Sequence, residues 1–158
     1  MSHTGLNERP DQRRDVERRA GEEMAATQMA SALVVDDDQD TRDILRIVLE
    51  DAGYAVTEAA DGVLALDALR ASVSPLAVVL DLDLPRLDGL GVLRAVADDA
   101  RLSERHAFVL LTAVAHQRYQ AAQDVCAQLA VPLILKPFEL DTLLDALAAA
   151  SHRVSPRM

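Results

Sequence analysis

The chain has 158 residues, 50% of them hydrophobic, and a formal net charge of −10 at pH 7. This length suits one domain with a sizeable core, and the acidic surface excludes direct binding of nucleic acid as a main role. Its single cysteine, Cys126, rules out an internal disulfide, and no apolar stretch reaches the ~20 residues of a membrane span, so we expect a cytoplasmic protein without membrane insertion.

Residues 1–30 differ in composition from the rest of the chain. Between Glu8 and Glu23, acids and arginines are mixed, with almost no aliphatic side chain. Such a segment buries too little apolar surface to offset its ordering entropy, so we expect 1–30 to be a disordered or weakly helical extension. Its arginines are balanced by neighbouring glutamates and do not predict a nucleic-acid arm.

From residue 32 onward, short apolar runs alternate with helical patterns, which is typical of a parallel sheet covered on both faces. The apolar runs predict five strands, near residues 32–36, 54–58, 76–81, 107–112 and 131–135. The helical patterns predict five helices, near residues 40–52, 62–71, 89–99, 116–129 and 139–150. We therefore expect one α/β domain over 31–150 and a short tail over 151–158.

Three of the predicted strands end in charged residues. The first runs into Asp36 and Asp37. The third ends at Asp81, and the fifth is followed by Lys136, the only lysine in the chain. Where arginine is otherwise the cation, a lone lysine indicates a need for a compact ammonium group. Because the carboxyl ends of parallel strands meet at one edge of a sheet, we expect three carboxylates and one amine to gather there.

Such a cluster needs neutralisation, because two carboxylates about 4 Å apart repel by roughly 4 kcal/mol at an effective dielectric of about 20. Hard oxygen ligands with an open, watery coordination sphere favour Mg²⁺. Asp81 can then attack phosphorus and hold an aspartyl phosphate while Lys136 neutralises the added charge. Thr112, at the end of the fourth strand, could donate its hydroxyl to a phosphoryl oxygen, and Pro137 could hold a cis bond beside Lys136.

Other polar residues have simpler interpretations. Asp38 is expected to cap the first helix, and Gly53 is free to adopt the left-handed conformation that ends it. His106 and His116 lack the spacing of metal ligands, so we expect surface or loop positions for both. Cys126 is expected to be a buried small hydrophobe rather than a reactive thiol.

Taken in order, these residues resemble the receiver domain of two-component response regulators over about residues 32–150. The matching pieces are LVVDDD at 33–38, Asp81 with Pro85 and Asp88-Gly89, Thr112-Ala113, and Lys136-Pro137-Phe138. The resemblance implies a flavodoxin-like (βα)5 fold, a doubly wound parallel sheet of strand order 2-1-3-4-5. The site would lie over the first and third strands.

The resemblance also implies a role for each site residue. Asp36 and Asp37 match the acid pair that binds Mg²⁺, and Asp81 matches the phosphoacceptor, which is also a metal ligand. Asp83 stands where the family lends a backbone carbonyl to the metal, and its side chain falls where the phosphoryl lifetime is tuned. Thr112 and Lys136 match the phosphate-sensing pair.

The implied function is that of a stand-alone phosphoacceptor domain of a two-component or phosphorelay system. It would receive a phosphoryl group from a sensor histidine kinase or a histidine phosphotransfer protein and signal through contact with a downstream protein target. It would not be an enzyme in the usual sense, because it would catalyse only its own phosphorylation and dephosphorylation.

Two alternatives remain open from the sequence. Asp81-Leu82-Asp83 imitates the DxD pair of haloacid dehalogenase-like phosphatases, although Pro85 replaces the residue type that this family uses and only helix-face acids follow Lys136. The other alternative is a pseudo-receiver, an interaction module that signals without phosphorylation. Leu133 supports it, because receivers usually carry tyrosine or phenylalanine at that position.

Overall fold

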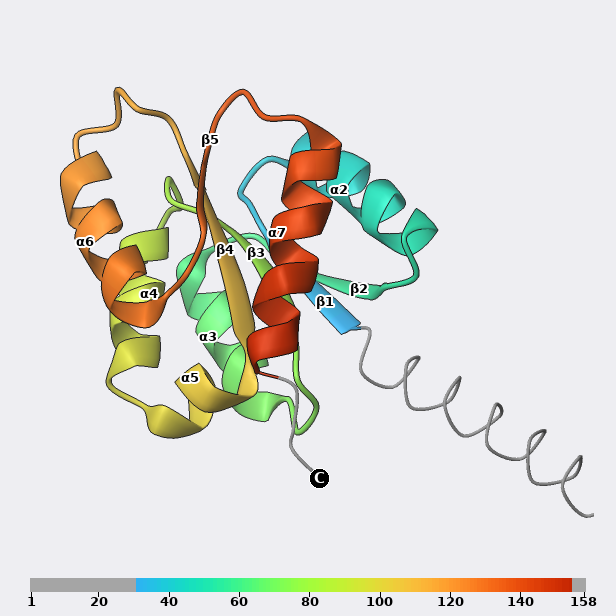
Figure 1. Cartoon of the computed structure of the whole chain (residues 1–158), viewed down its shortest axis with the longest axis horizontal. Helices are drawn as coiled ribbons and strands as arrows, with labels where there is room; N and C mark the ends of the chain where they lie inside the picture. The colour runs from blue at the N-terminus through green and yellow to red at the C-terminus, as the bar shows by residue number, and fades with distance from the viewer. Residues whose placement is uncertain (1–30, 155–158) are drawn as a thin grey trace, which may run out of the picture.

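In the computed structural model of the chain, residues 31–154 are described, and the statements below refer to this part. The expectations for 1–30 and for the tail residues 155–158 lie outside the described residues. Five parallel strands form a single sheet in the order β2-β1-β3-β4-β5, which confirms the predicted strand order. Helices cover both faces of this sheet (Figure 1).

The strands are close to their predicted positions: β1 (Ser31–Val35), β2 (Ala55–Ala59), β3 (Ala77–Asp81), β4 (Ala107–Thr112) and β5 (Leu133–Leu135). The largest difference is at β5, which was predicted to begin at residue 131. Pro132 has no N–H to donate, but its carbonyl accepts a hydrogen bond from the Leu110 amide at 3.0 Å. Contact with β4 therefore starts one residue before the regular strand.

Six helices are present among residues 31–154: α2 (Gln39–Asp51), α3 (Gly62–Ala71), α4 (Gly89–Ala97), α5 (Ala100–Arg105), α6 (Tyr119–Leu129) and α7 (Leu140–Arg153). Five of them were predicted. The sixth, α5, has only 6 residues, which is too few to show an apolar period. Helix α7 continues to Arg153, three residues beyond the predicted end of the last helix.

Alternate side chains of the strands enter two separate cores. On one face, residues such as Leu33, Leu80 and Leu110 pack with α3, α4 and α6. On the other face, residues such as Val34 and Val79 pack with α2 and α7, the two helices at the right of Figure 1. Every residue of β3 and β4 is buried, so both strands have the continuous apolar character of central parallel strands.

Aspartate side chains cap the first turns of four helices. The caps of α2, α3, α4 and α5 each accept a hydrogen bond from a backbone N–H of the following turn, and they are Asp38, Asp61, Asp88 and Asp99. The predicted role of Asp38 is thus confirmed. Helices α6 and α7 begin without a side-chain cap.

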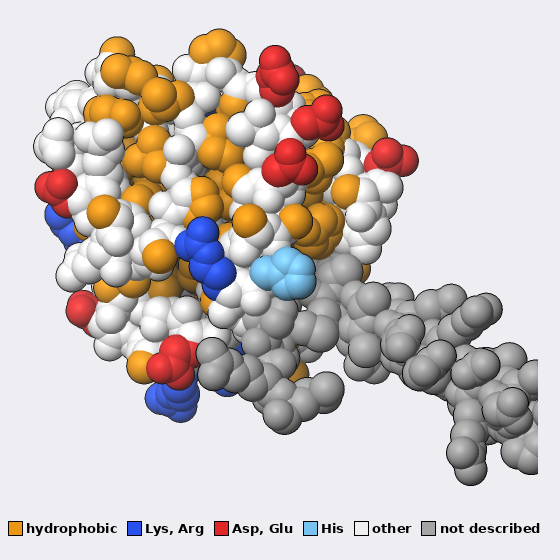
Figure 2. Space-filling model, in the orientation of Figure 1, with side chains coloured by type: hydrophobic (Ala, Val, Ile, Leu, Met, Phe, Trp, Pro, Cys, Tyr) orange, Lys and Arg blue, Asp and Glu red, His pale blue; other side chains and the backbone are white. Residues whose placement is uncertain are grey.

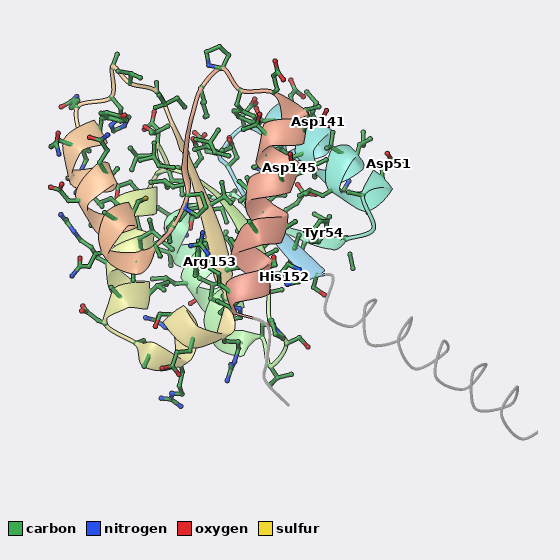
Figure 3. All side chains as sticks on the ribbon, in the orientation of Figure 1. Asp51, Tyr54, Asp141, Asp145, His152 and Arg153 are labelled. Carbon is green, nitrogen blue, oxygen red and sulfur yellow. The ribbon has the colours of Figure 1, made fainter. Side chains whose placement is uncertain are left out.

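Helix α7 is acidic at its start and basic at its end. Asp141 and Asp145 point away from the sheet near the first turns, and His152 and Arg153 lie at the far end (Figure 3). This order complements the helix dipole. On the face drawn in Figure 2, acidic side chains gather at the upper right, toward the edge where the strands end. No helix among residues 31–154 is long and apolar enough to cross a membrane.

Candidate functional site

Three carboxylates meet at the carboxyl edge of the sheet. Strands β1 and β3 are neighbours, with Val35 opposite Leu80, so the residues that follow them leave the sheet side by side. One carboxylate oxygen from each of Asp36, Asp37 and Asp81 lies within 4.8 Å of the other two. The structure therefore brings together the three acids that the sequence predicted would meet.

The backbone around Asp36 is held on several sides. Its amide donates to the Ala59 carbonyl at 3.2 Å, and its carboxylate accepts from the Asp38 amide at 2.9 Å. Its carbonyl oxygen accepts from Arg42 Nη1 at 2.6 Å, while Arg42 Nε forms a salt bridge with Glu58 at 3.0 Å. Sequence analysis missed this supporting role of Arg42, because its partner Glu58 is 16 positions away.

Lys136 supplies the positive charge of the site. Its Nζ donates to Oδ1 of Asp81 at 2.7 Å, and the two side chains are 38% and 7% exposed. The Lys136 amide donates to the Thr112 carbonyl at 2.8 Å, which fixes the end of β5 beside the end of β4. The peptide bond between Lys136 and Pro137 is cis, as the sequence suggested.

Burial disfavours the ionised form of the carboxyl groups at this site. It raises the pKa of Asp81 from 3.8 to about 6, although the bond and the charge of Lys136 oppose the shift, and the charges of Asp36 and Asp83 add to it. Burial also raises the pKa of Asp36. The oxygen donor set fits a hard divalent cation such as Mg²⁺, and the exposed Asp37 keeps one side open to water and phosphate.

Thr112 and Asp83 are near this cluster but outside it. Thr112 is 2% exposed and follows Leu111, which pairs with Asp81 in the sheet. Its hydroxyl donates to the carbonyl of Ala113 at 3.3 Å. Asp83 is exposed, and the role predicted for its backbone carbonyl stays a prediction.

His106 lies in the connection between α5 and β4, in agreement with the expected loop position, but the expected surface exposure is wrong. It is 1% exposed, and both ring nitrogens have backbone partners. The Leu76 amide donates to Nδ1 at 3.1 Å, and Nε2 lies 3.1 Å from the Leu69 carbonyl. Cys126 is buried as expected, and burial raises the pKa of its thiol to about 11, which keeps it protonated and unreactive.

A family model for the response regulator receiver domain matches residues 32–148. The chain belongs to this family. Receivers are the phosphoacceptor signalling domains of two-component systems, and the comparisons favour neither the phosphatase nor the pseudo-receiver alternative.

Curated relatives of this receiver include the response regulator MprA of Mycobacterium sp. (strain KMS), which is 43% identical over 127 residues. The match covers 78% of this chain and 51% of the relative. The MprA protein of Mycobacterium avium (strain 104) is 42% identical with nearly the same coverage, 78% and 52%. The receiver thus spans about half the length of the curated relatives it matches.

Solved structures agree with the fold. The chemotaxis protein CheY4 of Vibrio cholerae superimposes with a TM-score of 0.63 at 27% identity, covering 77% of this chain and 98% of that one. The signal receiver domain of a signal transduction histidine kinase from Syntrophus aciditrophicus gives a TM-score of 0.71 at 21% identity, covering 82% and 95%. The second likeness shows the fold alone, and together they confirm the flavodoxin-like sheet.

Proposed function

We propose that this receiver accepts a phosphoryl group on Asp81 from the phosphohistidine of a sensor histidine kinase or a histidine phosphotransfer protein. One observation carries the proposal. Asp81 is buried beside two further carboxylates within 4.8 Å and is bonded to the chain's only lysine at 2.7 Å. An acid cluster with a single amine suits reversible transfer of an anionic group better than it suits a purely structural role.

The transfer step uses the two oxygens of Asp81 differently. Lys136 Nζ bonds Oδ1, which leaves Oδ2 to attack phosphorus. The new bond joins Oδ2 to phosphorus, and the bond that breaks joins phosphorus to the histidine nitrogen of the donor. That nitrogen keeps the electron pair, and because the other ring nitrogen of the donor carries a proton, neutral imidazole leaves. Lys136 then faces the added negative charge, and Thr112 turns its hydroxyl to a phosphoryl oxygen.

Mg²⁺ would be held by the side chains of Asp36, Asp37 and Asp81 and by the backbone carbonyl of Asp83. When bound, the ion supplies positive charge beside the transferred phosphoryl oxygens. The chain's contribution is to preform the acid cluster. It does so by bonding the Asp36 carboxylate to the Asp38 amide and the Asp36 carbonyl to Arg42.

The output is a protein contact rather than turnover of a substrate. Phosphorylation at Asp81 would shift an equilibrium between two conformations of the surface, by a coupling of about 1 to 3 kcal/mol, and a downstream protein would read that shift. The working domain corresponds to residues 31–150, in the cytoplasm. Catalysis by the chain would be limited to its own phosphorylation and dephosphorylation.

Acetyl phosphate with Mg²⁺ tests the assignment of Asp81. We expect wild-type protein to gain one acid-labile, hydroxylamine-sensitive phosphoryl group per chain, measured by intact mass. Asp81→Asn removes the nucleophilic oxygen and should lower labelling at least about 100-fold. The matched control is Asp67→Asn, because Asp67 is an exposed aspartate on α3. Labelling of the Asp81 variant at the wild-type rate would refute the assignment.

Metal removal tests the acid cluster separately. Excess EDTA should stop labelling of the wild-type chain, and added Mg²⁺ should restore it, because three carboxylates with one amine cannot accept a phosphoryl dianion unaided. Steady hydrolysis of a phosphate ester over many cycles, instead of one label per chain, would point to a phosphatase.

A further inference from the structure

An ion pair joins the two loops that leave the site. Residues 82–88 follow the phosphoacceptor strand β3, and residues 113–118 follow β4 and Thr112, at the upper left of Figure 1. Arg118 Nη1 donates to Oδ2 of Asp88 across the 30 positions that separate them. Asp88 is 19% exposed and Arg118 is 44% exposed at their side chains, so the contact is only partly screened by water.

The Asp88 end of this pair is anchored against the site. Asp88 Oδ1 accepts from the Gly91 amide at 2.8 Å and so caps α4. The next residue, Gly89, donates its amide to the Leu82 carbonyl at 2.9 Å. A Cβ at Gly89 would lie only 2.5 Å from the Asp81 carbonyl oxygen, so the lack of a side chain allows α4 to begin directly beside the phosphoacceptor.

The Arg118 end of the pair is held less firmly. Arg118 is the N-cap residue of α6, and its side chain makes no capping hydrogen bond. Within the loop, the His116 amide donates to Ala113 and the Arg118 amide donates to His116 Nδ1, and both are local bonds. Among residues 31–154, the Arg118–Asp88 pair is the hydrogen bond that ties loop 113–118 to loop 82–88.

The first residue of loop 113–118 is bonded to the Thr112 side chain. In the present conformation, the Thr112 hydroxyl donates to the Ala113 carbonyl, at the first residue of that loop. Turning the hydroxyl toward Asp81 breaks this bond, so the Ala113 carbonyl at the start of the loop loses this contact. At the other end of the loop, the ion pair between Arg118 and the anchored Asp88 opposes a displacement of the loop backbone.

We propose that the Arg118–Asp88 ion pair is a latch that holds loop 113–118 in its resting position, so that it sets how readily this receiver enters the phosphoryl-loaded conformation. The inference rests on the proposed function for its coupling to Asp81. By thermodynamic reciprocity, weakening the latch must tighten the binding of any ligand that favours the loaded conformation. Arg118 and Asp88 are positioning residues and take no part in the transfer itself.

The position of Tyr119 indicates which part of the surface changes when the Arg118–Asp88 ion pair breaks. Tyr119 follows Arg118 as the first residue of α6, and it lines a groove with Leu133 and Leu135 of β5. Its hydroxyl accepts from Gln123 Nε2 at 3.0 Å, one turn along α6. Movement of Arg118 therefore displaces an aromatic side chain beside Leu133.

A second ion pair of the same design provides the matched control. Asp61 caps α3 through Oδ1, which accepts from the Leu64 amide at 2.8 Å, and its Oδ2 accepts from Arg86 Nη1 at 3.2 Å. Arg86, however, joins loop 82–88 to the start of α3 and not to loop 113–118. Arg86→Gln removes the same chemistry without touching the latch.

The first test needs no phosphoryl group. Order parameters from ¹⁵N relaxation of the metal-free chain should fall for residues 113–118 in Arg118→Gln and in Asp88→Asn, because both variants lose the ion pair. Asparagine is chosen at position 88 because it keeps the cap on Gly91 and loses only the charge. They should stay at wild-type values in Arg86→Gln. An Arg118 variant whose loop is as ordered as in the wild type overturns the latch.

The second test measures how the ion pair affects ligand binding at the site. Calorimetry measures the binding of beryllofluoride in the presence of Mg²⁺. We expect Arg118→Gln and Asp88→Asn to bind about 2- to 5-fold tighter than wild type, the range that a partly exposed ion pair provides, with Arg86→Gln unchanged. Unchanged or weaker binding by the latch variants overturns the coupling. If wild type binds no beryllofluoride, the proposed function fails together with the coupling, and the relaxation test alone decides whether the pair holds the loop.

Discussion

A buried titratable group lies at each end of the β3–β4 pair, and the two groups have different roles: one belongs to the candidate site and the other supports the fold. Asp81 lies at the carboxyl end and is 5% exposed, and His106 lies just before the amino end of β4 and is 1% exposed. Burial moves the pKa of both toward the neutral form, upward for the acid and downward for the histidine. Burial alone therefore does not mark a functional group.

The difference lies in how each group is satisfied. Both nitrogens of His106 have backbone partners, so the ring completes the hydrogen bonding of the α3 end and the β3 start. Asp81 has one amine and two neighbouring carboxylates, an arrangement that is left short of positive charge. A buried group whose charge is incompletely neutralised indicates a binding site, whereas a fully bonded one indicates architecture.

The largest expected effect concerns the architectural end. His106→Ala leaves the Leu76 amide and the Leu69 carbonyl unpaired and enlarges a pocket of about 200 Å³ that His106 lines. We expect it to lower the free energy of unfolding by about 3 kcal/mol. Urea titration followed by circular dichroism measures this, because the chain has no tryptophan.

His152→Ala is the control for that experiment, since His152 is exposed at the end of α7 (Figure 3). Labelling by acetyl phosphate should persist in folded His106→Ala, because the site is at the other end of the strands. A loss of stability no larger than that of the His152 variant would contradict the architectural role.

At the other end of the strands, replacing Asp81 should change the unfolding free energy in the opposite direction. Because the folded-state pKa of Asp81 lies above its unfolded value, the stability linked to this carboxyl is present below pH 3.8 and is lost as the pH rises to about 6. Asp81→Asn should therefore raise the unfolding free energy of the metal-free chain at pH 7, by about 1 to 2 kcal/mol after the lost Lys136 bond is allowed for. A destabilised variant would show that Asp81 is architectural too.

The smallest expected effect is a pH dependence that belongs to His106. Its folded-state pKa lies below the ordinary 6.5, chiefly because of burial, with the charge of Arg105 acting in the same direction. Its contribution to stability is therefore complete above pH 6.5 and is lost as the pH falls below that value.

The wild-type chain alone does not isolate this effect, because Asp81 changes stability in the opposite direction. The difference in unfolding free energy between wild type and His106→Ala removes the contribution of Asp81. This difference should be largest above about pH 7 and should shrink toward about pH 5. A difference that stays constant over this range would show that His106 does not titrate in the folded chain.

Much of the fold and of the acid cluster could be predicted, because both depend on short-range patterns. Each strand is an apolar run, and Asp36, Asp37, Asp81 and Lys136 stand directly at strand ends, where topology alone brings them to one edge. The capping role of Asp38 is equally local, since its partner Thr41 is three positions away.

The features that sequence analysis missed depend on distant partners or weak periodicity. His106 is buried against residues 30 and 37 positions away, and Arg118 reaches Asp88 across 30 positions. No pattern within a few residues reports such contacts. Helix α5 is too short for its single buried side chain, Leu102, to show a period.

The solitary lysine allows selective chemical modification beside the acid cluster. Lys136 carries the chain's only side-chain primary amine, and its side chain is 38% exposed. An acylating reagent would thus modify the site and the amino terminus and no other amine. The rate of acylation would report whether the Lys136 ammonium group is bonded to Asp81. The same measurement can be made on the protein without a phosphoryl group and in mixtures with a candidate kinase.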